Sequence, residues 1–249
     1  MAPKYSPLAT YIESIHYGDD FPYSRGPIFD YGITHPSPTL RSDRINSILV
    51  YPGSFNPPHR GHFELLRHGF MKSGRDMNII AAVVLPLDDE SLVKKLIGHK
   101  SPLIFTKAER IRLWNGYGRS DWYWTYDRST DEWFESQRRI SKTISKDGFD
   151  ISWTMLCGPD YVQIHQVPQI PVWGCKDIII SDAGRAADFT PCAVKRLTSL
   201  NGCGTWGEMV LDFQTPQTYA QEAVSWMFSG AFMISPQSTQ QMLGKGGCR

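Results

Sequence analysis

The sequence has almost no excess of charge of either sign. Its 26 Lys and Arg residues nearly balance its 25 Asp and Glu residues, which leaves a formal net charge of +1 at pH 7. A protein whose main partner is DNA or an anionic membrane usually carries a clear basic excess. The balance therefore argues against nucleic-acid or membrane binding as the main function, and it leaves room for a few basic groups facing a nucleotide.

Long hydrophobic runs and paired cysteines are also missing. No stretch approaches the roughly 18 apolar residues that a membrane-spanning helix needs, and the N-terminus does not read as a secretory signal. The five cysteines are odd in number, widely spread and without a CxxC pair: Cys157, Cys175, Cys192, Cys203 and Cys248. Such a set suits neither a disulfide framework nor a zinc site, so we expect an intracellular protein, cytoplasmic or nuclear.

Residues 1–45 lack any sustained helical or strand period. Pro, Tyr, Ser, Asp and Gly dominate this part of the chain. We interpret it as an irregular extension, packed by its aromatic side chains on a single domain formed by residues 46–249. A chain of 249 residues is long enough for one α/β domain with a well-buried core.

From residue 46 onward, strand and helix patterns alternate. The predicted strands are 48–52, 78–87, 122–126, 153–157, 177–181 and 209–213, and the predicted helices are 62–72, 106–117 and 131–146. Thr106 and Glu109 have the spacing of a capping box. Near-continuous apolar strands are typical of a parallel sheet covered on both faces. The sequence therefore predicts an α/β fold with a doubly wound, Rossmann-like parallel sheet, whose ligands bind at the carboxyl ends of the strands.

The most informative segment follows the first predicted strand. Residues 53–62 read Gly-Ser-Phe-Asn-Pro-Pro-His-Arg-Gly-His, and a helix is predicted to begin around His59 to His62. The unpaired N–H groups of a first helical turn favour an anion, and imidazoles three residues apart can both donate to phosphate oxygens. Gly53 allows a close backbone approach, and Gly61 removes a side chain that would crowd a ligand. Two ordinary surface histidines are the alternative, which the rarity of this combination disfavours.

This run resembles the (H/T)xGH signature of the nucleotidyltransferase superfamily, and its lead-in is most similar to nicotinamide-mononucleotide adenylyltransferases. The resemblance extends over roughly residues 46–240. It implies that the 5′-phosphate of nicotinamide or nicotinic acid mononucleotide attacks ATP, giving a NAD-type dinucleotide and pyrophosphate. It also implies that a Mg²⁺ ion accompanies ATP without a protein ligand cluster, and that His59 and His62 form the catalytic pair. The neighbouring residues expected to bind ATP are Gly53, Ser54, Phe55, Asn56 and Gly61.

Later segments follow the order of the same family. Lys94 and Lys95 resemble a Lys-rich loop near the substrate phosphates, and a solvated surface pair is the alternative. Arg110 resembles a buried or active-site arginine of a family helix, and an exposed arginine on a plain amphipathic helix is the alternative. By resemblance, all three are expected at the ATP phosphates.

The mononucleotide site is expected from two further segments. Tyr126 stands where the family stacks an aromatic ring on the pyridine, although Trp124 or Trp133 could take this role and all three could be core residues. The run Leu-Cys-Gly158-Pro-Asp160 resembles the family's Leu-Cys-Gly-Ala-Asp. There the glycine would admit the nucleotide, and the aspartate would accept a hydrogen bond from a ribose hydroxyl or the carboxamide. A plain Gly-Pro-Asp turn is the alternative.

The C-terminal region departs most from the family pattern. A motif Ile-Ser-Ser-Thr-x-x-Arg is expected at a helix start, and here Ser238 and Thr239 stand for its hydroxyl pair while Met242 replaces the arginine. Losing that cation could lower the rate on the order of 10³-fold. Two alternatives therefore stay open: a cytidylyl- or pantetheine-phosphate adenylyltransferase with another acceptor, and a nucleotide-binding protein of weak or no activity. A homo-oligomer is compatible with the sequence, which does not define it.

Overall fold

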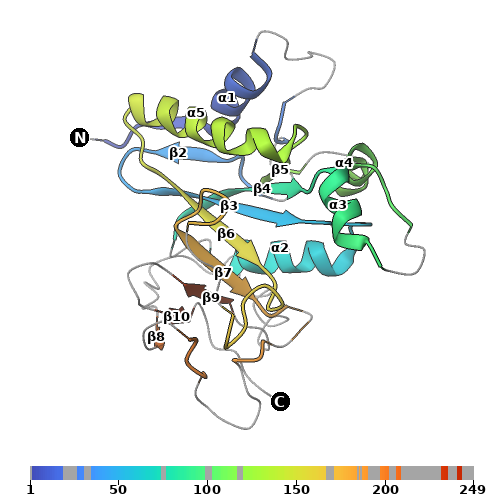
Figure 1. The fold of residues 1–249 in the computed structure, drawn as a ribbon. Helices are drawn as coiled ribbons and strands as arrows, with labels where there is room; N and C mark the ends of the chain where they lie inside the picture. The colour runs from blue at the N-terminus through green and yellow to red at the C-terminus, as the bar shows by residue number, and fades with distance from the viewer. Residues whose placement is uncertain are drawn as a thin grey trace.

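The structure is a computed structural model, in which one sheet organises the chain (Figure 1). It describes residues 2–18, 27–30, 35–73, 77–98, 103–116, 120–166, 171–183, 185, 187–189, 197–201, 206–208, 231–234 and 240–242. The eight strands of the main sheet follow the order β5-β4-β3-β6-β7-β9-β10-β8. The first five pair in parallel: β5 (Tyr123–Thr125), β4 (Ile79–Pro86), β3 (Asn46–Gly53), β6 (Ile151–Cys157) and β7 (Asp177–Ser181). The predicted Rossmann-like parallel sheet is therefore confirmed.

Helices cover both faces of this sheet. Helix α2 (Arg60–Ser73) lies on one face, and α5 (Trp133–Lys146) lies on the other, preceded by the short helix η4 (Thr130–Glu132) (Figure 1). Helix α4 (Lys107–Asn115) begins at Thr106, whose predicted capping box with Glu109 is confirmed. None of the described helices is long and apolar enough to cross a membrane.

A helix forms where the sequence indicated a Lys-rich loop. Helix α3 (Asp89–Leu96) contains both Lys94 and Lys95 in its last turn, with Asp89 and Glu90 in its first turn. Acidic groups near the N-terminus and basic groups near the C-terminus both stabilise a helix through its dipole. The two lysines are therefore held on a regular element, which corrects the expected loop.

The C-terminal strands complete the sheet. Strand β9 (Ala231–Ile234) runs antiparallel to β7, and β10 (Gln240–Met242) joins β9 to β8 (Trp206–Glu208). The helix start expected around Met242 is wrong, since this residue lies in β10. The predicted strand 209–213 lies outside the described residues, as do Ser238 and Thr239.

The N-terminal extension contains regular structure, contrary to the expectation of an irregular segment. Strands β1 (Tyr5–Pro7) and β2 (Thr39–Arg41) pair antiparallel, and α1 (Leu8–Ile12) continues into the π-helical turn η1 (Glu13–Tyr17). These elements are too short to show a period in sequence. Tertiary contacts hold them, because α1 and η1 pack on α5.

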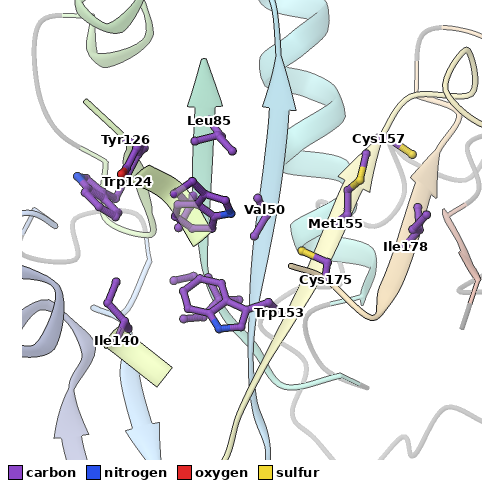
Figure 2. Close-up of a cluster of buried hydrophobic side chains, with 14 of the residues drawn as sticks. Val50, Leu85, Trp124, Tyr126, Ile140, Trp153, Met155, Cys157, Cys175 and Ile178 are labelled. Atoms are coloured by element: carbon purple, nitrogen blue, oxygen red, sulfur yellow. The ribbon is translucent and has the colours of Figure 1, made fainter. Parts of the chain in front are cut away.

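Alternation along β3 divides the core between the two faces of the sheet. Ile48 and Val50 belong to the cluster beneath α1 and α5, whereas Leu49 and Tyr51 belong to the cluster beneath α2. This is the expected period of two for a strand buried on both faces. Figure 2 shows part of the first cluster, in which Trp124 and Tyr126 lie side by side near the end of β4.

Candidate functional site

The loop between β3 and α2 delivers the two histidines of the predicted motif. His59 stands at the N-cap of α2, where its carbonyl oxygen accepts the backbone N–H of His62 at 2.9 Å and that of Phe63 at 3.3 Å. Its Nδ1 accepts the N–H of Gly61 at 3.1 Å. The predicted helix start is confirmed, and a histidine side chain takes the capping role that Ser or Asp often fills.

The imidazole rings of His59 and His62 form one stacked unit. Their centroids lie 3.7 Å apart with an interplanar angle of 27°, and Nδ1 of His62 accepts the backbone N–H of His59 at 3.2 Å. Both Nδ1 atoms therefore act as acceptors. In the neutral form of each ring the proton must then lie on Nε2, which leaves each ring one N–H donor for a ligand.

His62 is held in its neutral form. Burial lowers its pKa to about 4, the charge of His59 acts in the same direction, and only Asp160 opposes them. At neutral pH this ring is a hydrogen-bond donor without a charge. A neutral ring of this kind can serve as a fixed hydrogen-bond donor to a phosphate oxygen without adding a positive charge.

Phe55 forms the floor beneath this pair. Its ring is 2% exposed and packs edge-on against His62, Tyr51 and Trp114, with centroids 5.0 to 5.2 Å apart. A Cβ added at Gly53 would lie 2.6 Å from the Phe55 ring. Gly53 is therefore required so that Phe55 can support His62, and both residues act on the site through His62.

Gly61 leaves room for the stacked pair itself. A Cβ added at this position would lie 3.1 Å from atoms of the His59 ring. In this structure, a side chain at position 61 would therefore crowd the ring of His59.

Two residues that were predicted to bind ATP, Asn56 and Arg110, make hydrogen bonds that connect the loop after β3 to neighbouring segments. Asn56 accepts the N–H of Phe105 and donates to the carbonyl of Leu103, both at 2.8 Å. Arg110 is fully buried. It donates to the Ser54 carbonyl at 2.8 Å, and its other acceptors are the carbonyls of Leu87 and Phe105 and the carboxylate of Asp89. The exposed alternative is therefore wrong for Arg110, which is the buried arginine that the resemblance allowed, and its donors bond protein acceptors in this structure.

The lysines of α3 border the same loop. Lys95 Nζ donates to the Ser54 hydroxyl at 3.0 Å, and both Lys94 and Lys95 are exposed to solvent. The structure thus brings Ser54 and Lys95 together beside the β3 loop.

The loop after β6 meets the histidines at the point where the strand order reverses. The chain runs from β3 outward to β4 and β5, and then returns to β6 on the other side of β3. Ligands of such sheets bind in the crevice at this reversal. Asp160 lies close enough to act electrostatically on His62 and Tyr51, and with burial it raises the pKa of Tyr51. A Cβ at Gly158 would lie 2.7 Å from the Asp160 carboxylate, so Gly158 allows this aspartate to fold back.

Tyr126 and Trp133 have no exposed surface, contrary to the expectation of an open stacking face. The Tyr126 hydroxyl lies 3.2 Å from the Ser136 hydroxyl, and Trp133 Nε1 donates to the Trp173 carbonyl at 3.1 Å. Figure 2 shows Tyr126 within the buried cluster. In this structure both rings are core residues, as the alternative proposed.

Asp88 connects the strand ends in a way that sequence reasoning missed. Although burial alone would raise its pKa, the Lys107 ammonium and the donors of Thr130 and Ser129 lower it to about 2. Asp88 follows β4, and its partners lie on α4 and after β5. The only indication of this linking role in the sequence was the position of Asp88 just after a buried strand.

A cavity of about 760 Å³ opens beside the edge strand β5. It is lined by α4 residues Lys107, Ile111 and Asn115, whereas Arg110 and Trp114 on another face of α4 contact the β3 loop. The cavity is therefore separate from the histidine pair. Within the described part of the chain, no group of three or more His, Cys, Asp or Glu could hold a metal ion.

Comparison with known proteins agrees with this arrangement. Residues 50–169 match the cytidylyltransferase-like family. The matched range begins in β3 and ends after β6, so it contains His59, His62 and Asp160. The match supports a nucleotidyltransferase in general. A search of curated proteins finds no match.

Proposed function

We propose that this protein joins the AMP moiety of ATP to the 5′-phosphate of nicotinamide or nicotinic acid mononucleotide, releasing pyrophosphate. The observation that carries the proposal is the His59–His62 pair, which caps α2 beside the strand-order reversal. The Nδ1 atoms of both rings accept backbone N–H groups, so the Nε2–H of each ring is left for a ligand. A phosphate placed there also lies at the N-terminus of α2, where the helix dipole favours an anion.

The proposed chemistry needs no protein nucleophile. An oxygen of the acceptor phosphate forms a bond to the α-phosphorus of ATP, and the bond from that phosphorus to the bridging oxygen breaks. Pyrophosphate leaves with the electron pair. The protein contributes position and stabilisation of charge on the phosphates, which are the main sources of catalysis in such transfers.

In the proposed complex, the phosphates are positioned and their charge is stabilised by His59, His62 and Lys95. The Nε2–H groups of the two imidazoles donate to phosphate oxygens, while Lys95 beside Ser54 supplies an exposed positive charge. We propose that Mg²⁺ enters as the complex with ATP, since phosphate oxygens and water satisfy this ion without a dedicated protein cage.

The name of the matched family favours a second candidate, a transferase that uses CTP. The β3 loop and the histidine pair would serve the same role with either nucleotide. A binding protein with little or no turnover is the third candidate, and it is favoured by Met242 in the place of the expected arginine.

The deciding experiment measures dinucleotide and pyrophosphate formation from ATP, Mg²⁺ and nicotinamide mononucleotide. Nicotinic acid mononucleotide, CTP and pantetheine phosphate serve as parallel substrates. We expect NAD from the first mixture. Product from CTP or pantetheine phosphate alone would replace the proposed substrates, and nucleotide binding without product in any mixture would make the protein a binding protein.

A further inference from the structure

Helix α3 has an exposed side on which apolar and oppositely charged side chains lie together. Its members follow the helical spacing i, i+3, i+4 and i+7, which places them on one side of a helix. These four residues, here named the α3 face, are Glu90, Val93, Lys94 and Ile97. All four are exposed to solvent, and Figure 1 shows α3 at the periphery of the fold.

The other sides of α3 hold the helix on the domain. Leu92 has no exposed surface. The Asp89 carboxylate accepts a hydrogen bond from Arg110 at 2.7 Å, and Lys95 Nζ donates to the Ser54 hydroxyl at 3.0 Å. The helix is therefore anchored by side chains that do not belong to the α3 face.

The apolar part of this surface is unusually open to water. Ile97 is 75% exposed and Val93 is 46% exposed. Leu103 is 74% exposed, and its carbonyl accepts a hydrogen bond from Asn56, in the same loop that Lys95 contacts. Among the large hydrophobic side chains that the structure describes, Ile97 and Leu103 have the highest exposed fractions. Single exposed apolar residues are common, whereas neighbouring ones mark interaction surfaces.

The charges of the α3 face are complementary to themselves. Glu90 lies in the first turn of α3 and Lys94 in its last turn, and neither has an ion-pair partner within the described part of the chain. When two copies of α3 run antiparallel about a twofold axis, Lys94 of each copy meets Glu90 of the other. Val93 and Ile97 are then enclosed between the helices, whose dipoles oppose each other favourably.

We propose that the α3 face is a homodimer interface, on which a second copy of this chain packs its own α3 in the antiparallel direction. An anionic membrane suits this surface less well. Membrane recognition of that kind uses clusters of about four to eight Lys or Arg residues, whereas the α3 face carries one lysine and one glutamate. A balance of opposite charges at the two ends of a helix matches the same helix turned around.

The interface is small, which determines its strength. Stable complexes bury about 800 Å² on each partner, and one side of an eight-residue helix with Leu103 covers less than this. We therefore expect a reversible dimer, with a dissociation constant on the order of 10 µM. The second copy packs on the same helix that contacts the β3 loop, so the dimer brings its two candidate sites close to the interface.

Sedimentation velocity of the full-length chain from about 1 to 200 µM tests the proposal. We expect the unchanged chain to shift from monomer to dimer over this range. Ile97→Asp should weaken the dimer by at least about 30-fold, because it places two unpaired charges in the apolar centre. Ile45→Asp is the matched control, since Ile45 is 58% exposed and lies before β3, and it should dimerise like the unchanged chain. Circular dichroism checks the folding of each variant.

Reversal of single charges tests the antiparallel arrangement. Glu90→Lys and Lys94→Glu should each weaken the dimer by at least about 5-fold, because each places like charges at both symmetry-related contacts. An equimolar mixture of the two variants should restore association, since one chain then presents two lysines and the other two glutamates. The double variant Glu90→Lys/Lys94→Glu should dimerise by itself.

A chain that is still monomeric at about 200 µM overturns the proposal. So does a dimer that folded Ile97→Asp leaves unchanged, or a mixture of the charge variants that associates no better than either variant alone. If Ile97→Asp does not fold, the charge variants decide. Cosedimentation of a monomeric chain with phosphatidylserine vesicles, lost in Lys94→Glu, would assign the α3 face to a membrane instead.

Discussion

His62 Nδ1 accepts the backbone N–H of His59 at 3.2 Å, and the two imidazole rings stack at 3.7 Å. The side chain of His62 thus fixes the backbone of the residue that caps α2. The same contact determines which ring nitrogen carries the proton, so the local structure of the helix start and the chemistry of the site depend on each other.

Replacing His62 by Ala should lower turnover by at least about 10²-fold, because it removes a fixed donor to the transition-state phosphate. The fold should persist, since His62 is only partly buried. Steady-state kinetics and a thermal melt measure both effects. His165→Ala, an exposed histidine after β6, is the control and should retain full turnover. Near-normal turnover of His62→Ala would remove this residue from the mechanism.

The pKa of about 4 for His62 predicts a specific pH dependence. The folded protein binds this proton less readily than the unfolded chain, whose histidine titrates near 6.5. His62 therefore destabilises the fold progressively as pH falls from about 6.5 to about 4, and has no such effect above this window. Comparing melts of the unchanged chain and His62→Gln from pH 7.5 to 4.5 measures this. A stability difference that does not change with pH would contradict the lowered pKa.

Arg110→Met should destabilise the protein by about 3 kcal/mol, because three loop carbonyls and the Asp89 carboxylate lose a buried donor. Urea denaturation measures the change. Arg112→Met is the control on the same helix; Arg112 is exposed, so its replacement should alter stability by less than about 0.5 kcal/mol. Equal effects of the two changes would show that Arg110 does not hold the loops together.

Gly53→Ala should cost about 2 kcal/mol and reduce turnover, because the added methyl group overlaps the Phe55 ring beneath His62. Gly61→Ala should be milder in stability, since its added Cβ approaches only the His59 side chain, at 3.1 Å. Thermal unfolding and kinetics on both variants give the comparison. A fully active and stable Gly53→Ala would show that the Phe55 floor is dispensable.

Several features followed from local sequence. The apolar run that becomes β3, the His59–His62 loop and the Thr106 cap depend on residues within a few positions of one another. Period, capping chemistry and glycine placement act at this range, so their predictions are confirmed. The parallel sheet followed from the alternation of such segments.

Other features were decided only by the tertiary structure. Tyr126 is buried among several rings, which include His16, 110 residues earlier, and Trp133. Arg110 is buried because the loops after β3 and β4 close over it. The sequence alone determined the five parallel strands of the sheet and where the histidine pair stands. Which aromatic and charged side chains remain open to a ligand depended on distant segments, because burial is a property of what covers a residue and not of the residue itself.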